Sequence, residues 1–174
     1  MERFPYNTLN AENPGISGFG DLYQNINQMN LFISRTLHTD VLTESARNYY
    51  LGQVYGLRAY YMYQLYRSWG DVVFTEEPSL GFEVGKLAKA ATPAAEIFEQ
   101  VKKDIESSLS YFGSDYTIKE KKSLWSKAAT LMLKADVYLW SAHRDGGEGD
   151  ARTAKNALVD IQNNISRSNL DLMD

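Results

Sequence analysis

Apolar side chains recur at three- and four-residue steps in five separate stretches of the 174-residue chain. This spacing places them on one face of a helix and leaves polar residues on the other face. Polar segments that contain glycine or proline separate the stretches. We therefore expect an all-α protein of about five helices. The expected helices cover residues 19–37, 43–69, 92–112, 123–143 and 150–165, with the last four ranges counted from a capping residue.

Four of the expected helices begin at a residue that suits a helix N-terminus. Thr43, Ser123 and Asp150 each carry a short side-chain oxygen that can accept a hydrogen bond from the first turn. Thr92 is followed by Pro93, and proline is favoured at the first helical position. The expected helix breakers are Gly70, Gly146, Gly147 and Gly149.

The expected helix over residues 43–69 is apolar or aromatic around most of its circumference. Seven of the 12 tyrosines lie between Tyr49 and Tyr66. A helix of this kind is usually packed on several sides, so core packing is favoured over a sugar-stacking platform of tyrosine rings. The small residues Gly56 and Ala59 would let a neighbouring helix approach closely.

The chain divides into a helical domain with irregular ends. Residues 1–18 are expected to form an irregular leader, residues 19–166 the helical domain, and residues 167–174 a frayed end. The connection over residues 70–91 is longer than most loops, and loops of that length are often functional or packed under another element. It contains a short β-like run, Val72–Thr75.

A weak internal repeat favours helical hairpins of the tetratricopeptide (TPR) kind. The triplet at residues 57–59, Leu-Arg-Ala, recurs as Leu-Lys-Ala at residues 133–135. This repeat pairs the first helix with the second and the third with the fourth. The fifth helix is then left without a mate, as in a helical repeat that is cut open at its end.

Composition and charge exclude several classes of protein. The chain has no cysteine, which excludes disulfides, thiol catalysis and zinc–thiolate sites. Its net charge of −4 without a basic cluster argues against a nucleic-acid partner. No stretch approaches the roughly 20 apolar residues of a membrane span, and the first residues do not read as a signal peptide.

Residues 56–72, GLRAYYMYQLYRSWGDV, resemble the hallmark segment of the SusD/RagB family, which reads roughly E-x-x-x-L-R-A-Y-Y-Y-F-x-L-V-R-x-F/W-G-D-V-P. Val73 stands where the family usually has proline. Four further segments match family motifs in the same order, so that the resemblance covers residues 19–165. These segments are residues 22–33, 92–105, 127–139 and 151–161.

The resemblance implies a non-catalytic surface lipoprotein of Bacteroidetes outer membranes that needs no cofactor. Such a protein forms a lid over a TonB-dependent, SusC-like transporter and receives oligosaccharides or, in some members, peptides. Its helical repeats mainly act as scaffold and transporter contact, so the motif residues Arg58, Tyr61, Gly70 and Asp71 are expected to mark the fold rather than contact ligand. Family members are much longer and carry a lipid anchor on a cysteine that this chain lacks. We therefore expect a TPR-like helical portion of a SusD-like protein, as a fragment or a short member.

Few residues suggest a ligand or metal site from the sequence alone. Trp69, at a helix end beside the long loop, is the best aromatic candidate for ligand binding, although it could instead pack the loop onto the helices. Asp145, Glu148 and Asp150 offer oxygen ligands of the kind that calcium prefers. They lack EF-hand spacing, so a solvated turn is favoured over a metal site.

Two other functions remain open at this point. A free-standing TPR-like adaptor would bind a protein segment in the groove between helix pairs. An all-helical enzyme would need converging carboxylates or histidines, and the chain has only His38 and His143, far apart in sequence. We therefore expect no catalytic activity.

Overall fold

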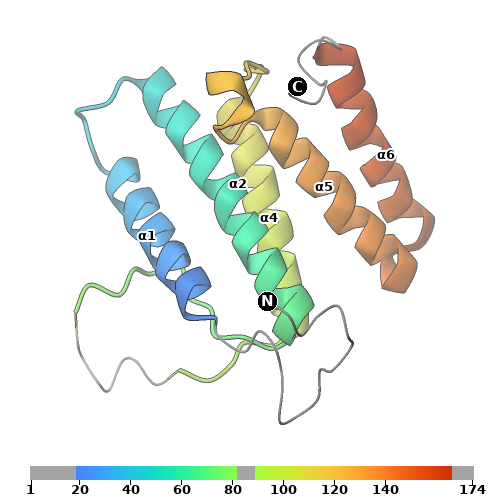
Figure 1. The fold of residues 1–174 in the computed structure, drawn as a ribbon, viewed down its shortest axis with the longest axis horizontal. Coiled ribbons are helices and arrows are strands. Elements are labelled where there is room, and N and C mark those ends of the chain that lie inside the picture. The colour runs from blue at the N-terminus through green and yellow to red at the C-terminus, as the bar shows by residue number, and fades with distance from the viewer. Residues whose placement is uncertain (1–18, 82–88, 166–174) are drawn as a thin grey trace, which may run out of the picture.

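The computed structural model describes residues 19–81 and 89–165, which form five α-helices (Figure 1). No strand occurs in these residues, and Val72 and Thr92 form an isolated antiparallel bridge. The all-α prediction is therefore confirmed. The helices are α1 (Gly20–Leu37), α2 (Glu44–Trp69), α4 (Ala94–Phe112), α5 (Lys127–Ser141) and α6 (Gly147–Asn164), with a 3₁₀ turn η1 (Glu120–Lys122) and a π-helix η2 (Ala142–Gly146).

The five helices lie side by side in chain order, with α2 and α4 at the centre (Figure 1). The interface between α2 and α4 is the most extensive, followed by that between α5 and α6. The helices predicted to pair, α1 with α2 and α4 with α5, are in contact, but their interfaces are smaller than those of α2 with α4 and of α5 with α6. No helix follows α6 within the described residues, but α6 is packed along α5 rather than left free.

Two hydrophobic cores hold this row of helices together. The larger core lies between α1, α2, α4 and α5, and the completely buried Tyr63 and Leu65 of α2 belong to it. The smaller core lies between α5 and α6, where Ala154 and Ile161 are buried against α5. Burying one large apolar side chain contributes about 1.5–3 kcal/mol, so the two cores supply most of the stability of the row.

The prediction that Gly56 allows a close approach is confirmed. Gly56 lies against the indole of Trp125 and the hydroxyl of Thr130, and a Cβ built on it would clash with the Trp125 Nε1 atom. The same Nε1 donates a hydrogen bond of 2.8 Å to Thr130 Oγ1. α2 therefore meets the start of α5 at a contact that only glycine fits.

Three of the four predicted N-caps are wrong, because each of those helices begins at a different residue from the one predicted. Thr43 does cap α2, since its hydroxyl accepts a hydrogen bond from the Ala46 N–H. Thr92 instead pairs its backbone with Val72, and α4 begins at Ala94. Its side chain therefore caps nothing.

The other two errors lie at the ends of α5 and α6. Ser123 closes the η1 turn by donating to the Glu120 carbonyl, and Ser126 caps α5 instead. The predicted break near residue 146 is present, since Gly147 has φ of 55° and ψ of −146° and α6 packs back along α5. Helical hydrogen bonding resumes at Gly147, however, which is ahead of the predicted cap. Asp150 consequently lies inside the first turn of α6 rather than ahead of it.

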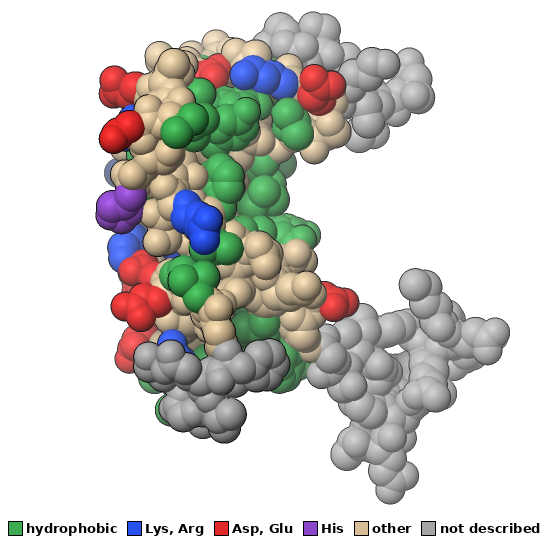
Figure 2. Space-filling view, turned by 90° about the vertical axis from the view of Figure 1, so that its left-hand side faces the viewer, with side chains coloured by type: hydrophobic (Ala, Val, Ile, Leu, Met, Phe, Trp, Pro, Cys, Tyr) green, Lys and Arg blue, Asp and Glu red, His purple; other side chains and the backbone are tan. Residues whose placement is uncertain are grey.

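The surface is divided between a hollowed apolar face and a charged edge. Figure 2 shows hydrophobic side chains gathered in the hollow, with charged side chains along the opposite edge. Exposed large apolar residues include Met132, Leu139 and Tyr60. In the described part of the chain, no helix combines the length and apolar character of a membrane span. The predicted leader over residues 1–18 and the frayed end over residues 167–174 lie outside the described residues.

Candidate functional site

A buried ion pair lies at the centre of the fold and joins three helices. Arg58 of α2 is only 2% exposed, and its Nε and Nη2 atoms each donate a 2.7 Å hydrogen bond to the carboxylate of Asp104 on α4. A third nitrogen, Nη1, donates to Asn30 Oδ1 of α1 over 2.8 Å. A bidentate pair of this kind fixes both geometry and charge. Arg58, a residue of the family motif, therefore sets the relative positions of α1, α2 and α4.

The charge on Arg58 is maintained by its partners. Burial opposes the charged form, but the hydrogen bond and the negative charge of Asp104 outweigh it and raise the pKa of Arg58. Glu76, on the loop after α2, lies 4.0 Å from the guanidinium and accepts a 2.9 Å hydrogen bond from Lys103. This Lys103 contact lowers the pKa of Glu76 and keeps it anionic. The network thus reaches from the core to the loop.

The same network holds the loop after α2 through main-chain atoms. Asn30 donates to the Thr75 carbonyl over 2.7 Å. One turn earlier in α1, the side-chain amide of Asn27 accepts from the Ser79 N–H over 2.7 Å and donates to the Ser79 carbonyl over 3.2 Å. The described first part of the predicted long loop, residues 70–81, is therefore tied onto α1.

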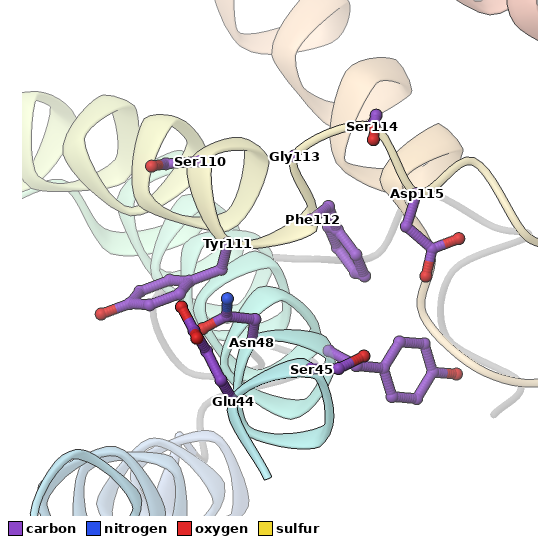
Figure 3. Close-up of a pocket in the computed structure, with 10 residues that line it drawn as sticks. Glu44, Ser45, Asn48, Ser110, Tyr111, Phe112, Gly113, Ser114 and Asp115 are labelled. Carbon is purple, nitrogen blue, oxygen red and sulfur yellow. The ribbon is translucent and has the colours of Figure 1, made fainter.

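A pocket of about 440 Å³ opens where the start of α2 meets the end of α4 (Figure 3). Its volume lies within the range of about 300–1,000 Å³ that is typical of small-molecule sites. In Figure 3 the side chains of Glu44 and Asn48 lie beside the ring of Tyr111, and Asp115 reaches down from the loop that follows α4. The pocket is lined by Glu44, Ser45, Asn48, Tyr49, Ser110, Tyr111, Phe112, Gly113, Ser114 and Asp115.

The aromatic part of this pocket is held in place by neighbouring rings. The Tyr111 ring stacks on Tyr55 of α2, with the centroids 5.6 Å apart and the planes 12° apart. Tyr49 packs edge-on against Phe112 at 6.3 Å and carries the ammonium of Lys119 at 3.6 Å from its centroid. These contacts orient the pocket's rings before any ligand arrives.

The charged groups that line the pocket are both carboxylates, Glu44 and Asp115. Burial would raise the pKa of Asp115, but hydrogen bonds from Thr117 and the positive charges of Lys119 and Lys127 lower it overall. Asp115 is therefore ionised at neutral pH. Carboxylates, amides and hydroxyls that converge beside aromatic rings can bind a polyhydroxylated ligand, because each sugar hydroxyl can both donate and accept.

Trp69, the aromatic candidate from the sequence, is partly buried at the end of α2. Its ring packs edge-on against Phe19 with the centroids 5.8 Å apart and lies against the larger core. This position agrees with the packing alternative, in which Trp69 covers the helix end. It is distant along α2 from the pocket near Glu44.

The acidic run near residue 146 does not converge. Asp145 and Asp150 both line a hollow beside the start of α4, whereas Glu148 lies outside that lining within the described residues. The Asp150 carboxylate contacts Gly146. Among the described parts of the chain, no group of three or more His, Cys, Asp or Glu side chains is placed to hold a metal ion.

Reasoning from the sequence missed the pocket at the start of α2. Its residues come from segments more than 60 positions apart, Glu44–Tyr49 and Ser110–Asp115, and no motif joins them. The available signal was the placement of Ser, Asn and acidic residues at the expected N-terminus of one helix and the C-terminus of another. That signal becomes informative only when α2 and α4 are known to be antiparallel neighbours.

Comparison with known proteins places the chain in one family. Residues 6–139 match a SusD-like family model described as "Starch-binding associating with outer membrane". SusD-like protein P38 of Formosa agariphila is 34% identical over 113 residues, which are 63% of this chain and 20% of that protein.

Solved structures agree with this match. NanU of B. fragilis is 50% identical, with a TM-score of 0.85 over 94% of this chain and 32% of that structure. A SusD superfamily protein of Bacteroides vulgatus is 48% identical, with a TM-score of 0.83 over 92% of this chain and 32% of that structure. The chain thus spans about a fifth of the curated relative and about a third of the two solved proteins. Because the family model matches most of the chain and the helices superpose on those of solved members, the chain belongs to the SusD-like family.

Proposed function

We propose that this chain serves as the helical part of a non-catalytic carbohydrate-binding protein at the outer membrane. In this proposal the protein is exposed to the outside, receives oligosaccharides and passes them to a TonB-dependent, SusC-like transporter. The helices act mainly as scaffold and as contact surface for that transporter.

The observation that carries this proposal is the family match over residues 6–139, whose description names starch binding and association with the outer membrane. The 50% and 48% identities to two solved neighbours support a scaffold shared with about a third of each of those proteins.

The buried network supports the scaffold role. Arg58, Asp104 and Asn30 are almost fully buried, and they connect three helices to the loop after α2. A buried ion pair of this kind is costly to break, so it suits a framework that must not rearrange when a ligand or partner binds.

Two measurements test the proposal on the protein as the cell makes it. Affinity purification from solubilised outer membranes should recover a TonB-dependent transporter, and binding to an oligosaccharide array should give saturable signals. A peptide library on the same support tests for a peptide ligand. Recovery of no transporter together with binding to no oligosaccharide would refute the proposal.

Surface exposure is tested separately by protease treatment of intact cells. The tagged protein should be degraded while a periplasmic control protein survives. Survival of the tagged protein in intact cells, with degradation after lysis, would contradict exposure to the outside.

A further inference from the structure

The pocket between the start of α2 and the end of α4 has the features of a ligand site of its own. Its volume is about 440 Å³, and it lies at the opposite end of α2 from Trp69 and the long loop. Because α2 has 26 residues at about 1.5 Å each, the two ends of the helix are roughly 39 Å apart. The pocket is therefore separate from any site that the described first part of the loop, residues 70–81, provides.

Five polar side chains of the pocket are not engaged elsewhere, whereas Asp115 Oδ1 accepts a 2.9 Å hydrogen bond from the Thr117 N–H. Within the described residues, Glu44, Ser45, Asn48, Ser110 and Ser114 make no side-chain hydrogen bond to the protein, in contrast to Asn27 and Asn30 of α1. Their donors and acceptors are available to a ligand. The aromatic side chains, by contrast, are held: Tyr111 is stacked on Tyr55, so binding would not have to order its ring.

The charges select the class of ligand. Both charged side chains that line the pocket are carboxylates, and the lowered pKa of Asp115 keeps its negative charge at neutral pH. Lys119 lies on the Tyr49 ring, where it offsets part of this charge without lining the pocket. A carboxylate or sulfate on a sugar would meet like charge, whereas neutral hydroxyls and an ammonium would meet acceptors.

We propose that this pocket binds a neutral or amino-sugar unit of an oligosaccharide and discriminates against acidic sugars. The inference rests on the proposed carbohydrate-binding function and names the site and the charge class of the sugar. In the bound state, Glu44, Asn48 and Asp115 bond sugar hydroxyls, and the ring of Tyr111 packs against the C–H groups of the sugar.

The test uses the full chain and three tetrasaccharides of different charge. Maltotetraose is neutral, tetraglucosamine is cationic and tetragalacturonate is anionic. Isothermal titration calorimetry should detect maltotetraose or tetraglucosamine, and tetragalacturonate should bind at least about tenfold more weakly. Preferential binding of tetragalacturonate, or binding of none of the three, overturns the inference.

Variants then locate the binding. Ser45→Phe fills the pocket from an exposed helical position and should weaken binding by about tenfold or more. Asn48→Ala removes one amide with little risk to the helix and should weaken it by about three- to tenfold, as expected for one lost hydrogen bond. The matched control is Ser68→Phe, which makes the same change at an exposed position in the last turn of α2.

The outcomes separate this inference from the broader function. Tetrasaccharide binding that is unchanged in both Ser45→Phe and Asn48→Ala refutes the pocket while leaving carbohydrate binding intact. Failure of the oligosaccharide array described above refutes both. Circular dichroism and thermal unfolding of each variant show whether a loss of binding comes from a loss of folding, and Asn48→Ala remains decisive if Ser45→Phe unfolds.

Discussion

The side chain of Asp71 accepts a 2.8 Å hydrogen bond from the backbone N–H of Ala94, 23 positions further along the chain. Ala94 is the first residue of α4, and its N–H has no partner within the helix. Asp71 therefore caps a helix from outside it, in the place that the sequence assigned to Thr92. The Gly-Asp pair of the family motif thus has a structural role: Gly70, with φ of 74°, turns the chain so that Asp71 faces α4.

Replacing Asp71 by alanine should lower the free energy of unfolding by about 1 kcal/mol, the usual cost of a lost helix cap. Asp71→Asn should retain most of that stability because an amide oxygen still accepts. Urea denaturation measures both variants. Glu77→Ala, an exposed acidic position in the same loop, is the control, and an equal loss in that variant would mean that charge rather than capping matters.

The Arg58–Asp104 pair should be the most sensitive polar contact in the fold. Arg58→Met leaves the Asp104 carboxylate buried and unpaired, and we expect a loss of about 3–5 kcal/mol. The surface pair between Lys102 and the exposed Glu99 serves as a control, since Glu99→Gln should cost less than about 1 kcal/mol.

The double variant Arg58→Met/Asp104→Leu distinguishes an unpaired charge from a lost contact. Removing both charges should restore a large part of the stability lost in Arg58→Met, because no ion is then left buried. Urea denaturation of the two variants side by side gives the comparison. A double variant that is less stable than the single one would contradict this explanation.

Glycine substitutions at two positions should have opposite effects. Gly56→Ala pushes a methyl group into the Trp125 indole and should destabilise the fold by about 1–3 kcal/mol. Gly149→Ala adds a methyl group where nothing lies within 4 Å, in a helix, and should stabilise it by about 0.5–1 kcal/mol. Thermal unfolding monitored by circular dichroism checks both, and equal shifts in the same direction would contradict the packing argument.

Stability should depend on Tyr116 at high pH. Burial and the hydrogen bond to Asp160, at 2.6 Å, raise the pKa of Tyr116 from 10.0 to about 12. A raised pKa in the folded state means that this contribution is fully present below pH 10 and is lost as the pH rises from 10 to about 12.

Urea denaturation between pH 8 and about 11.5 tests this contribution. Tyr116→Phe should be less stable than the parent at pH 8, and the difference should shrink as the pH rises. Tyr60→Phe removes a tyrosine hydroxyl that makes no hydrogen bond in the described part of the chain and serves as the matched control. A difference for Tyr116→Phe that does not change with pH would show that the hydroxyl contributes only packing.

The sequence predicted the helices because periodicity depends on local spacing, and Thr43 and Gly56 behave as their sequence context suggests. It did not predict Asp71 as a cap, since the contact joins residues that only the bridge between Val72 and Thr92 brings together. The prediction that Ser123 caps α5 is wrong because its hydroxyl donates to the Glu120 carbonyl in the turn that precedes α5.

The pocket near Glu44 could not be predicted from the sequence, because, like the Asp71 cap, it joins segments that are far apart along the chain. Its two halves meet only because α2 and α4 run antiparallel along their most extensive interface. Trp69, in contrast, could be seen from its position at a helix end, but its burial against Phe19 depends on how α1 packs.

The contacts from α1 to the loop have a consequence for how this surface can change. Asn30 donates a hydrogen bond to the Thr75 carbonyl, and Asn27 bonds the carbonyl and N–H of Ser79. At these points α1 therefore binds backbone atoms, which every residue other than proline possesses. The side chains at positions 75 and 79 are not what these amides recognise. Related proteins could therefore exchange the loop's surface residues, and with them its binding preference, while the same two asparagines keep the segment in place.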